Sequence, residues 1–344
     1  MRQALDADHP LDMLLLVGLM IEVLLPHEFS YAERLNRERL DPDPRIDDAA
    51  AVPGPEYTAV LTLVAEMAVV DEHVRQRCRD AVAERTDVLP RWISDLPKLT
   101  VGRAVRLRDT FGDLDQVLFE VRLADGRQIT CGVMIDHLEF STVKDVGVWD
   151  RPLDAVLVLI DSMELAFHPM EITTADARAW IEQAWGRGLA RRLGDERAGF
   201  LAVLKWLTDR LPEGGQPHQR GGSDQSAAEV VAAFFASPEG KRFDRAEFGD
   251  VLEDLIGMGS GDALRWSGFR IIYAIGDLPD GRAEPLETLL RLPALLRAYV
   301  PFAHERSGIG AELTAQTLAM IDEVQQSVED RFRSGLQQYW DTAG

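Results

Sequence analysis

The chain has 344 residues, of which 46% are hydrophobic and 28% charged, and its 58 acidic residues against 37 basic ones give a formal net charge of −21. This length and composition predict about two globular domains, each with a hydrophobic core of its own. Direct binding of nucleic acid depends on Lys and Arg that neutralise phosphates, so the acidic balance argues against it as the main function and leaves room only for a local basic patch at Arg187–Arg192.

The apolar run Leu11–Leu25 opens the chain. It is too short to cross a bilayer, it contains Asp12 and Glu22, and its acidic flank differs from the basic flank of a secretory signal. We therefore expect a buried helix, a cytoplasmic protein and no membrane association.

Three segments lead from this helix to the first strand. Asp41–Pro55 is rich in Pro and Asp and predicts an exposed loop. Glu56–Arg85 carries an apolar stripe at helical spacing and predicts one long helix, and a short helix is expected near Leu89–Leu96. Arg103–Asp109 then predicts a strand.

A β-hairpin is expected over Gln116–His137, where apolar and polar residues alternate. The turn Ala124-Asp125-Gly126 decides the register. A two-residue loop would pair Val121 with Thr130 and would put the two apolar sets on opposite faces. A three-residue loop pairs Val121 with Ile129, and it suits a type I turn that Gly126 closes in the left-handed region. Only the three-residue loop gives one continuous buried face.

The elements after the hairpin are mixed. Pro169 restricts the strand Leu165–Ile172 to an edge of the sheet, because proline donates no ladder hydrogen bond. The β-branched residues of Leu153–Ile160 favour a strand, but Pro152 before them suits a first helical turn, and we expect a helix. The other expected elements are a fourth strand at Lys144–Trp149 and helices at Thr173–Trp185 and Gly199–Leu211.

The polar, Gly-rich stretch Pro212–Asp224 predicts a linker, after which every segment is typical of helix. Ser226 and Glu229 have the spacing of a capping box. The last helix carries an apolar stripe of Leu318, Ile321, Val324, Val328, Phe332, Leu336 and Tyr339. The predicted fold class is therefore α+β and mostly helical: an α+β domain with a small antiparallel sheet over 1–211, a linker over 212–225 and an all-α domain over 226–344.

Three segments resemble a group of uncharacterised conserved proteins of actinobacteria. They are Ile135–Asp145 (IDH followed by STVKD), Thr173–Ala184 and Gly261–Ser267. In those proteins a longer Asn-Gly-Gly-type segment follows the IDH element, whereas this chain has Leu138-Glu139-Phe140. The resemblance implies shared domain boundaries and brings no activity.

A candidate catalytic group is formed by Asp136, His137 and Asp145, with Lys144 beside them. Carboxylate, imidazole and ammonium groups at a strand end can perform acid–base chemistry if they meet in a cleft. The alternative is that Asp136 faces solvent by alternation and that His137 caps the loop.

The sequence predicts no metal and no cofactor. Asp109, Asp113 and Asp115 could gather oxygens for a hard cation, but their spacing does not match an EF-hand loop and acidic hairpin turns are common. The two cysteines, Cys78 and Cys131, are too few for a disulfide framework or a cysteine-based zinc site. Arginines around Cys78 could lower its pKa if it is exposed, which leaves a redox role as an alternative.

The sequence shows no P-loop, no G-x-G-x-x-G and no G-x-S-x-G motif. We therefore expect a non-enzymatic cytoplasmic protein that acts through contacts with a protein partner or with itself. One alternative is an enzyme, such as a hydrolase, with a site near Asp136 and His137. The other is an acidic regulator with an indirect link to nucleic acid.

Overall fold

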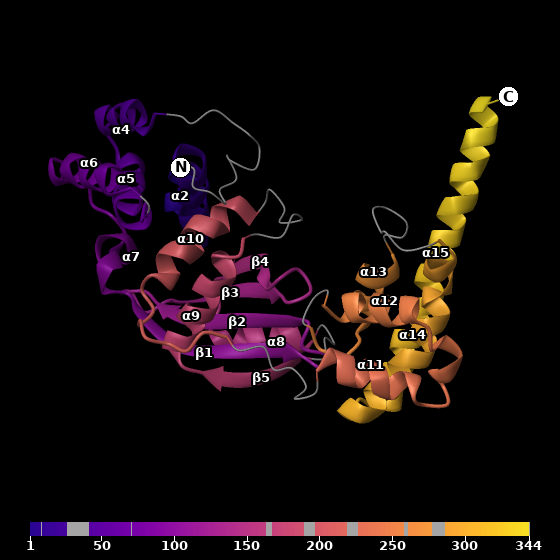
Figure 1. Cartoon of the computed structure of the whole chain (residues 1–344). Coiled ribbons are helices and arrows are strands. Elements are labelled where there is room, and N and C mark those ends of the chain that lie inside the picture. Colours follow the sequence, from indigo (N-terminus) through magenta and orange to yellow (C-terminus); the bar gives the residue numbers. More distant parts are fainter. Residues whose placement is uncertain are drawn as a thin grey trace. The chain divides into compact units, whose positions relative to one another are not determined.

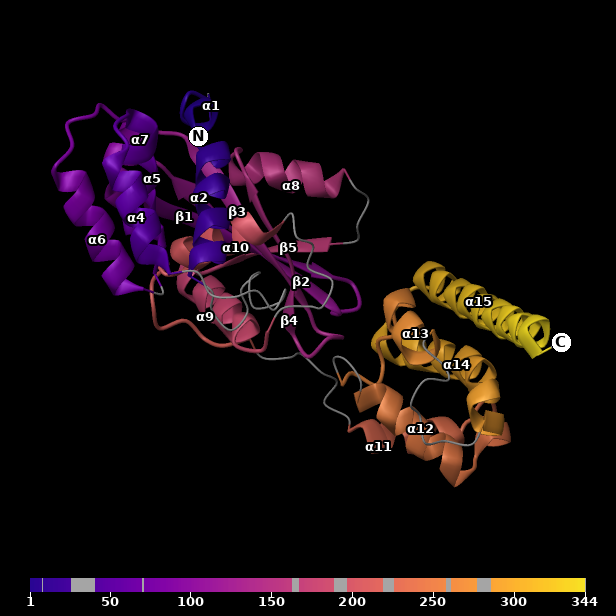
Figure 2. The same ribbon diagram turned by 90° about the horizontal axis from the view of Figure 1, so that it is seen from above.

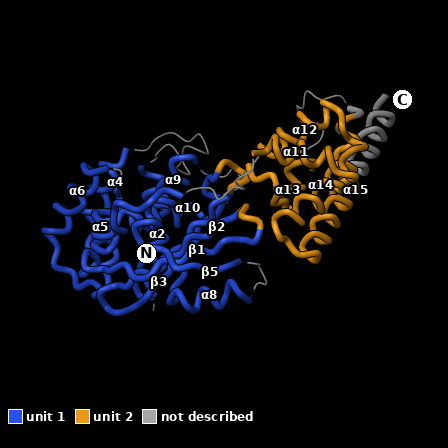
Figure 3. Tube along the Cα trace, turned by 60° about the horizontal axis from the view of Figure 1, so that its bottom comes forward, with its two compact units in different colours: residues 1–110, 114–136, 141–219 blue, residues 111–113, 137–140, 220–344 orange. Residues whose placement is uncertain are grey.

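The computed structural model describes residues 1–7, 9–25, 41–69, 71–162, 167–188, 197–218, 226–257, 261–276 and 286–343, except for the side chains of 286, 287, 289 and 328–343. The chain forms two compact units (Figure 3). The first contains 1–110, 114–136 and 141–219, and the second contains 111–113, 137–140 and 220–344. The first unit holds an antiparallel sheet and the second is built of helices, which confirms the predicted fold class.

A five-stranded antiparallel sheet in the order β4-β3-β2-β1-β5 is the centre of the first unit (Figure 1). The strands are β1 (Thr100–Asp109), β2 (Leu114–Arg122), β3 (Gln128–Asp136), β4 (Thr142–Trp149) and β5 (Phe167–Ile172). Both β4 and β5 are edge strands, so the predictions of a fourth strand and of an edge strand at Pro169 are confirmed.

The register of the β2–β3 hairpin is the one that the three-residue loop predicts. Val121 is paired with Ile129, and the N–H of Leu123 donates to the carbonyl of Arg127. Gly126 has a φ of +94°, in the left-handed region that favours glycine. The apolar residues of both strands therefore share one buried face.

Helices α9 (Thr174–Trp185) and α10 (Ala198–Thr208) pack on that face. Helices α2 (Leu11–Leu24) and α5 (Pro55–Met67) pack against α10 and against each other, and they extend the same core. Helices α2 and α10 cross closely in Figure 2 because both contribute a glycine. A Cβ atom on Gly18 would lie 2.2 Å from the carbonyl oxygen of Gly199. This face contains the main hydrophobic core, and it confirms that Leu11–Leu25 is a buried helix.

The opposite face of the sheet is covered by α8 (Leu153–Asp161), which confirms the helix expected after Pro152. Leu107 and Leu118 of the sheet pack there against Leu153 and Val156. This second core is smaller than the first, and it leaves the β4 side of the face for the pocket described below.

Two local predictions in the N-terminal part are wrong. The stretch expected as a loop contains α4 (Pro42–Ala51), because the Asp41 side chain accepts the N–H of Asp43 and a proline occupies the first turn. The long helix expected over Glu56–Arg85 is divided into α5 and α6 (Glu72–Ala83). Asp71 starts α6, since its carboxylate accepts the N–H of Val74.

The remaining elements of the first unit are short. Helix α1 (Arg2–Leu5) precedes α2, and α7 (Arg91–Ser94) and η1 (Leu96–Lys98) lie where a short helix is expected. Helix α9 starts as predicted, with the hydroxyl of Thr173 accepting the N–H of Asp176.

The described part of the expected linker, residues 212–218, is packed against α9. The N–H of Gln216 donates to Asp176, and the indole Nε1–H of Trp180 donates to the carbonyl of Gln216. Gly215 lies so close to α9 that a Cβ atom there would be 2.0 Å from the carbonyl oxygen of Ala175. Residues 219–225 of the expected linker lie outside the described residues, and the domain boundaries taken from the sequence stay a prediction.

The second unit contains α11 (Ala227–Phe235), η3 (Lys241–Phe243), α12 (Ala246–Gly257), α13 (Gly268–Ile275), α14 (Leu286–Ser307) and α15 (Ala311–Ala343). The capping box of Ser226 and Glu229 is confirmed. The core of the second unit includes Trp266, Tyr299 and the buried Arg270. The guanidinium of Arg270 donates to backbone carbonyls at the end of α12, and its Cζ lies 4.2 Å from the ring centroid of Trp266.

Within the described residues, no helix is long and apolar enough to cross a membrane. Of the apolar stripe predicted on the last helix, Ile321 and Val324 are buried in the second unit. The side chains of Val328, Phe332, Leu336 and Tyr339 lie outside the described residues.

Candidate ligand-binding pocket beside strand β4

Three strands of the first unit place a row of side chains on the α8 side of the sheet. Gln116 of β2 is directly opposite Met134 of β3, and Met134 is opposite Asp145 of β4. Their neighbours Val117 and Val133 belong to the main core on the other face. The alternation that buries the apolar residues therefore also brings these three side chains together.

The next row along the same face is a hollow, because two of its residues are glycines. Gly132 of β3 is opposite Gly147 of β4, and the indole of Trp149 lies over both. A Cβ atom on Gly132 would be 2.8 Å from Cζ3 of the indole, and one on Gly147 would be 2.7 Å from Cη2. Side chains at these positions would displace the ring, so both glycines are required for its placement.

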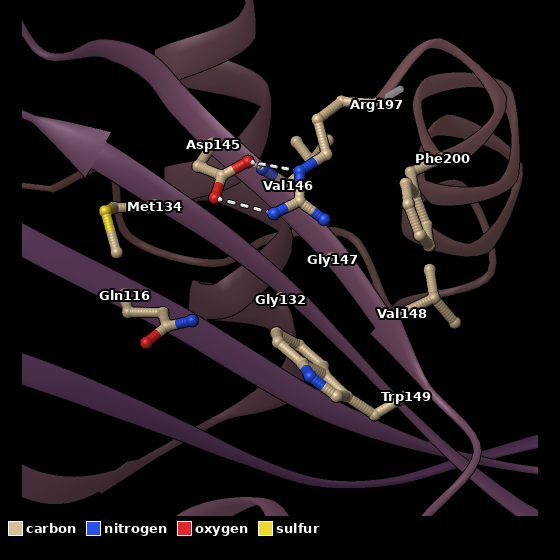
Figure 4. A pocket seen from close by; sticks show the side chains of 10 residues that line it. All are labelled: Gln116, Gly132, Met134, Asp145, Val146, Gly147, Val148, Trp149, Arg197 and Phe200. Carbon is tan, nitrogen blue, oxygen red and sulfur yellow. Dashed lines mark hydrogen bonds and ion pairs between the residues drawn. The ribbon is translucent and has the colours of Figure 1, made fainter. Parts of the chain in front are cut away.

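The hollow is part of a pocket with a volume of about 120 Å³. Since β4 is an edge strand, the pocket continues around its outer side to the start of α10. Figure 4 shows the lining side chains, which are Gln116, Gly132, Met134, Asp145, Val146, Gly147, Val148, Trp149, Arg197 and Phe200.

The carboxamide of Gln116 is the most informative group in this pocket. The residue is only 8% exposed, and its side chain points into the pocket (Figure 4). It makes no side-chain hydrogen bond with any residue that the structure describes. Neither amide atom belongs to the fully buried polar atoms that lack a partner, so the pocket leaves both accessible to a bound molecule.

An ion pair between Asp145 and Arg197 lies at the rim. Oδ1 of Asp145 is 3.1 Å from Nε of Arg197 and also accepts the N–H of Val146, and Oδ2 is 3.4 Å from Nη2 of Arg197. The two side chains are 42% and 36% exposed, so the pair adds little stability. Asp145 is thus held by a guanidinium and a backbone N–H, which does not suit the role of a free catalytic base.

The other two residues of the candidate catalytic group are placed differently. Asp136 is fully buried, so the expectation that it faces solvent is wrong. Its Oδ2 accepts a hydrogen bond of 2.7 Å from Nζ of Lys144. A β-bulge in β4 accompanies this ion pair: Met134 pairs with Asp145 but Ile135 pairs with Val143, which makes Lys144 the extra residue. Asp136 does not line the pocket.

His137 belongs to the second unit, where it is buried and its backbone N–H donates to the carbonyl of Asp113. The catalytic group proposed from the sequence therefore has one member, Asp145, in the pocket of the first unit.

A second polar cluster of the first unit is found at Arg106 and Asp115. Their side chains form a bidentate pair with both distances at 2.7 Å, and Nε2 of His218 lies 3.1 Å from each. Asp115 and His218 are residue types that bind metals, and a third such residue, His137, belongs to the second unit. Within the first unit the guanidinium occupies both oxygens of Asp115, so this pair alone does not suit a cation.

The remaining candidates from the sequence have structural roles. Asp109 accepts the N–H of Leu114 and so closes the β1–β2 turn. Burial raises the pKa of the Cys78 thiol to about 11, against the opposing effect of Arg77, and burial also raises the pKa of Cys131. Both thiols are buried and stay protonated near neutral pH, which does not support a redox role.

Sequence analysis did not single out Gln116, Gly132, Gly147, Trp149 or Arg197 as site residues. A usable indication was present: glycines inside strands, as at Gly132 and Gly147, often mark a close approach of another group. Arg197 could not have been found in this way, since its place beside β4 depends on how α10 packs.

Comparisons with known proteins add no assignment: no protein-family model, no curated protein and no solved structure matches the chain. The resemblance to uncharacterised actinobacterial proteins therefore stays a prediction.

Proposed function

We propose that the first unit is a binding module that holds a small organic ligand in the pocket beside β4. The observation that carries this proposal is the Gln116 carboxamide, which is 8% exposed, turned into the pocket and without a hydrogen bond to the described residues. A ligand in the pocket can therefore form hydrogen bonds with this carboxamide without displacing an interaction of the fold.

The lining favours binding over catalysis. Among the described residues around the pocket there is no His, Cys or Ser, and the one carboxylate, Asp145, is held by Arg197 and the N–H of Val146. A nucleophile and a base within hydrogen-bond reach are the usual requirements of a hydrolase. The pocket thus supports the expectation of a non-enzymatic protein over the alternative of a hydrolase.

The proposal can be tested by NMR with a library of neutral, acidic and basic single-ring fragments. We expect some fragments to shift the side-chain amide signals of Gln116 and the backbone signals of Gly132 and Gly147. Replacement of Gln116 by Met keeps the length of the side chain and removes the amide, so it should weaken these fragments at least tenfold. If no fragment shifts these signals, the pocket is not a binding site.

Contact with another protein is a second candidate function, and it rests on Phe140. This residue is 73% exposed and has a φ of +59°, and Ser141 after it has a φ of +60°. Non-glycine residues in the left-handed region are strained, and such strain is concentrated at functional loops. Replacement of Phe140 by Ser should reduce a concentration-dependent increase in mass measured by light scattering, or the recovery of a host protein identified by mass spectrometry. An unchanged result in both measurements would exclude this role.

A further inference from the structure

Resting on the proposed function, we propose that the ligand is a neutral, planar, single-ring molecule with an amide-type edge, such as a carboxamide or a lactam, in which a donor and an acceptor stand side by side.

The charge of the pocket favours a neutral ligand. Its two charged side chains, Asp145 and Arg197, form an ion pair with each other, so the net charge of the lining is zero. The carboxylate of Asp145 would repel an anionic ligand. A cationic ligand would compete with Arg197 for that carboxylate. A neutral ligand leaves the pair intact and can still accept a hydrogen bond from the guanidinium, which has five N–H donors.

The hydrogen-bonding groups favour an amide-type edge. The carboxamide of Gln116 offers both an acceptor oxygen and a donor nitrogen, and neither has a partner among the described residues. A carboxylate would satisfy only the donor, and an ammonium only the acceptor. A ligand that presents a carbonyl next to an N–H satisfies both, which is the condition for burial without cost.

The walls favour a flat ring of limited size. The indole of Trp149 lies next to Gly132 and Gly147 and lines the pocket, and aromatic rings bind planar groups by stacking. The volume of about 120 Å³ is slightly below the roughly 150 Å³ of a cavity that binds benzene, so one ring is the upper limit for the ligand.

Three probes that share one ring test this proposal: benzamide is neutral with an amide edge, benzoate is an anion and benzylamine is a cation at pH 7. Their dissociation constants for the full-length protein would be measured by ligand-observed NMR and by titration calorimetry. We expect benzamide to bind at least tenfold more tightly than either charged probe. Benzoate or benzylamine binding as tightly as benzamide would overturn the proposal.

Substitutions then locate the binding. Gln116→Met and Gln116→Glu should each weaken benzamide at least tenfold, the first because both hydrogen bonds are lost and the second because the donor is replaced by a charged acceptor. Gln76→Met, on the exposed face of α6, is the matched control and should leave the affinity unchanged. If benzamide binds equally well to wild type and Gln116→Met, it binds elsewhere and the proposal is wrong.

The outcomes separate this inference from the proposed function. If a probe or fragment of another class binds to wild type and is lost in Gln116→Met, the pocket is a binding site and the ligand class is wrong. If nothing shifts the Gln116 and Gly147 signals, both proposals fail together.

Discussion

The indole of Trp149 lies so close to Gly132 that a single added carbon, the Cβ atom of an alanine, would be 2.8 Å from the ring. The two residues lie on neighbouring strands of the first unit, and the contact determines where the aromatic wall of the pocket stands. The shape of the pocket therefore depends on the absence of a side chain.

Replacement of Gly132 by Ala should destabilise the first unit by about 1–3 kcal/mol, the usual cost of forcing extra volume into a packed region. The displaced indole should also shift the fluorescence of Trp149, which a comparison with Trp149→Phe would isolate. Gly310→Ala is the control, since a Cβ atom there meets nothing within 4 Å. An alanine at 132 that changes neither the urea midpoint nor the emission would show that the ring is free to move.

Replacement of Gly126 by Val should cost about 1–3 kcal/mol, because a β-branched residue resists a φ of +94°. A Cβ atom at this position meets no other atom within 4 Å, so the cost would come from the backbone alone. Gly126→Asn is the matched comparison, since Asn tolerates the left-handed region and should cost less. Equal losses for Val and Asn in chemical denaturation would contradict this explanation.

The register of the β2–β3 hairpin could be predicted to the residue because two independent local rules agree there, the alternation of apolar residues and the chemistry of a turn that ends in Gly126. The helix α4 was missed because Pro and Asp are typical of loops and equally of a first helical turn, and only the hydrogen bond from Asp43 to Asp41 separates the two cases. The pocket could not be predicted, because Arg197 and Trp149 meet there only through tertiary packing.

Replacement of Gly215 by Ala should detach residues 212–218 from α9, because the added carbon would be 2.0 Å from the carbonyl oxygen of Ala175. Cleavage by a glutamate-specific protease after Glu213, followed by mass spectrometry, should then be faster than in wild type. Gly310→Ala, where a Cβ atom meets nothing within 4 Å, is the control and should leave the cleavage rate unchanged. Cleavage at the wild-type rate in Gly215→Ala would mean that the packing does not protect this segment.

Acidification should destabilise the second unit through His304. Burial lowers the pKa of this imidazole below its ordinary 6.5, against a hydrogen bond to Trp266 that raises it. Below pH 6.5 the unfolded chain therefore binds a proton that the folded chain does not, and the free energy of unfolding falls as the pH decreases through 6.5. Urea unfolding between pH 5 and 8 should show a shallower pH dependence for His304→Gln than for wild type. Parallel curves would exclude this contribution.

The most direct test of the central claim is the melting temperature of Gln116→Met without any ligand. If the Gln116 carboxamide is kept for a ligand, it does not stabilise the free protein, and an apolar side chain of the same length should leave the melting temperature unchanged or raise it by up to about 2–4 °C, the shift expected for 1 kcal/mol in a domain of this size. A lower melting temperature for Gln116→Met would show that Gln116 serves the fold, and it would contradict the assignment of the pocket as a binding site.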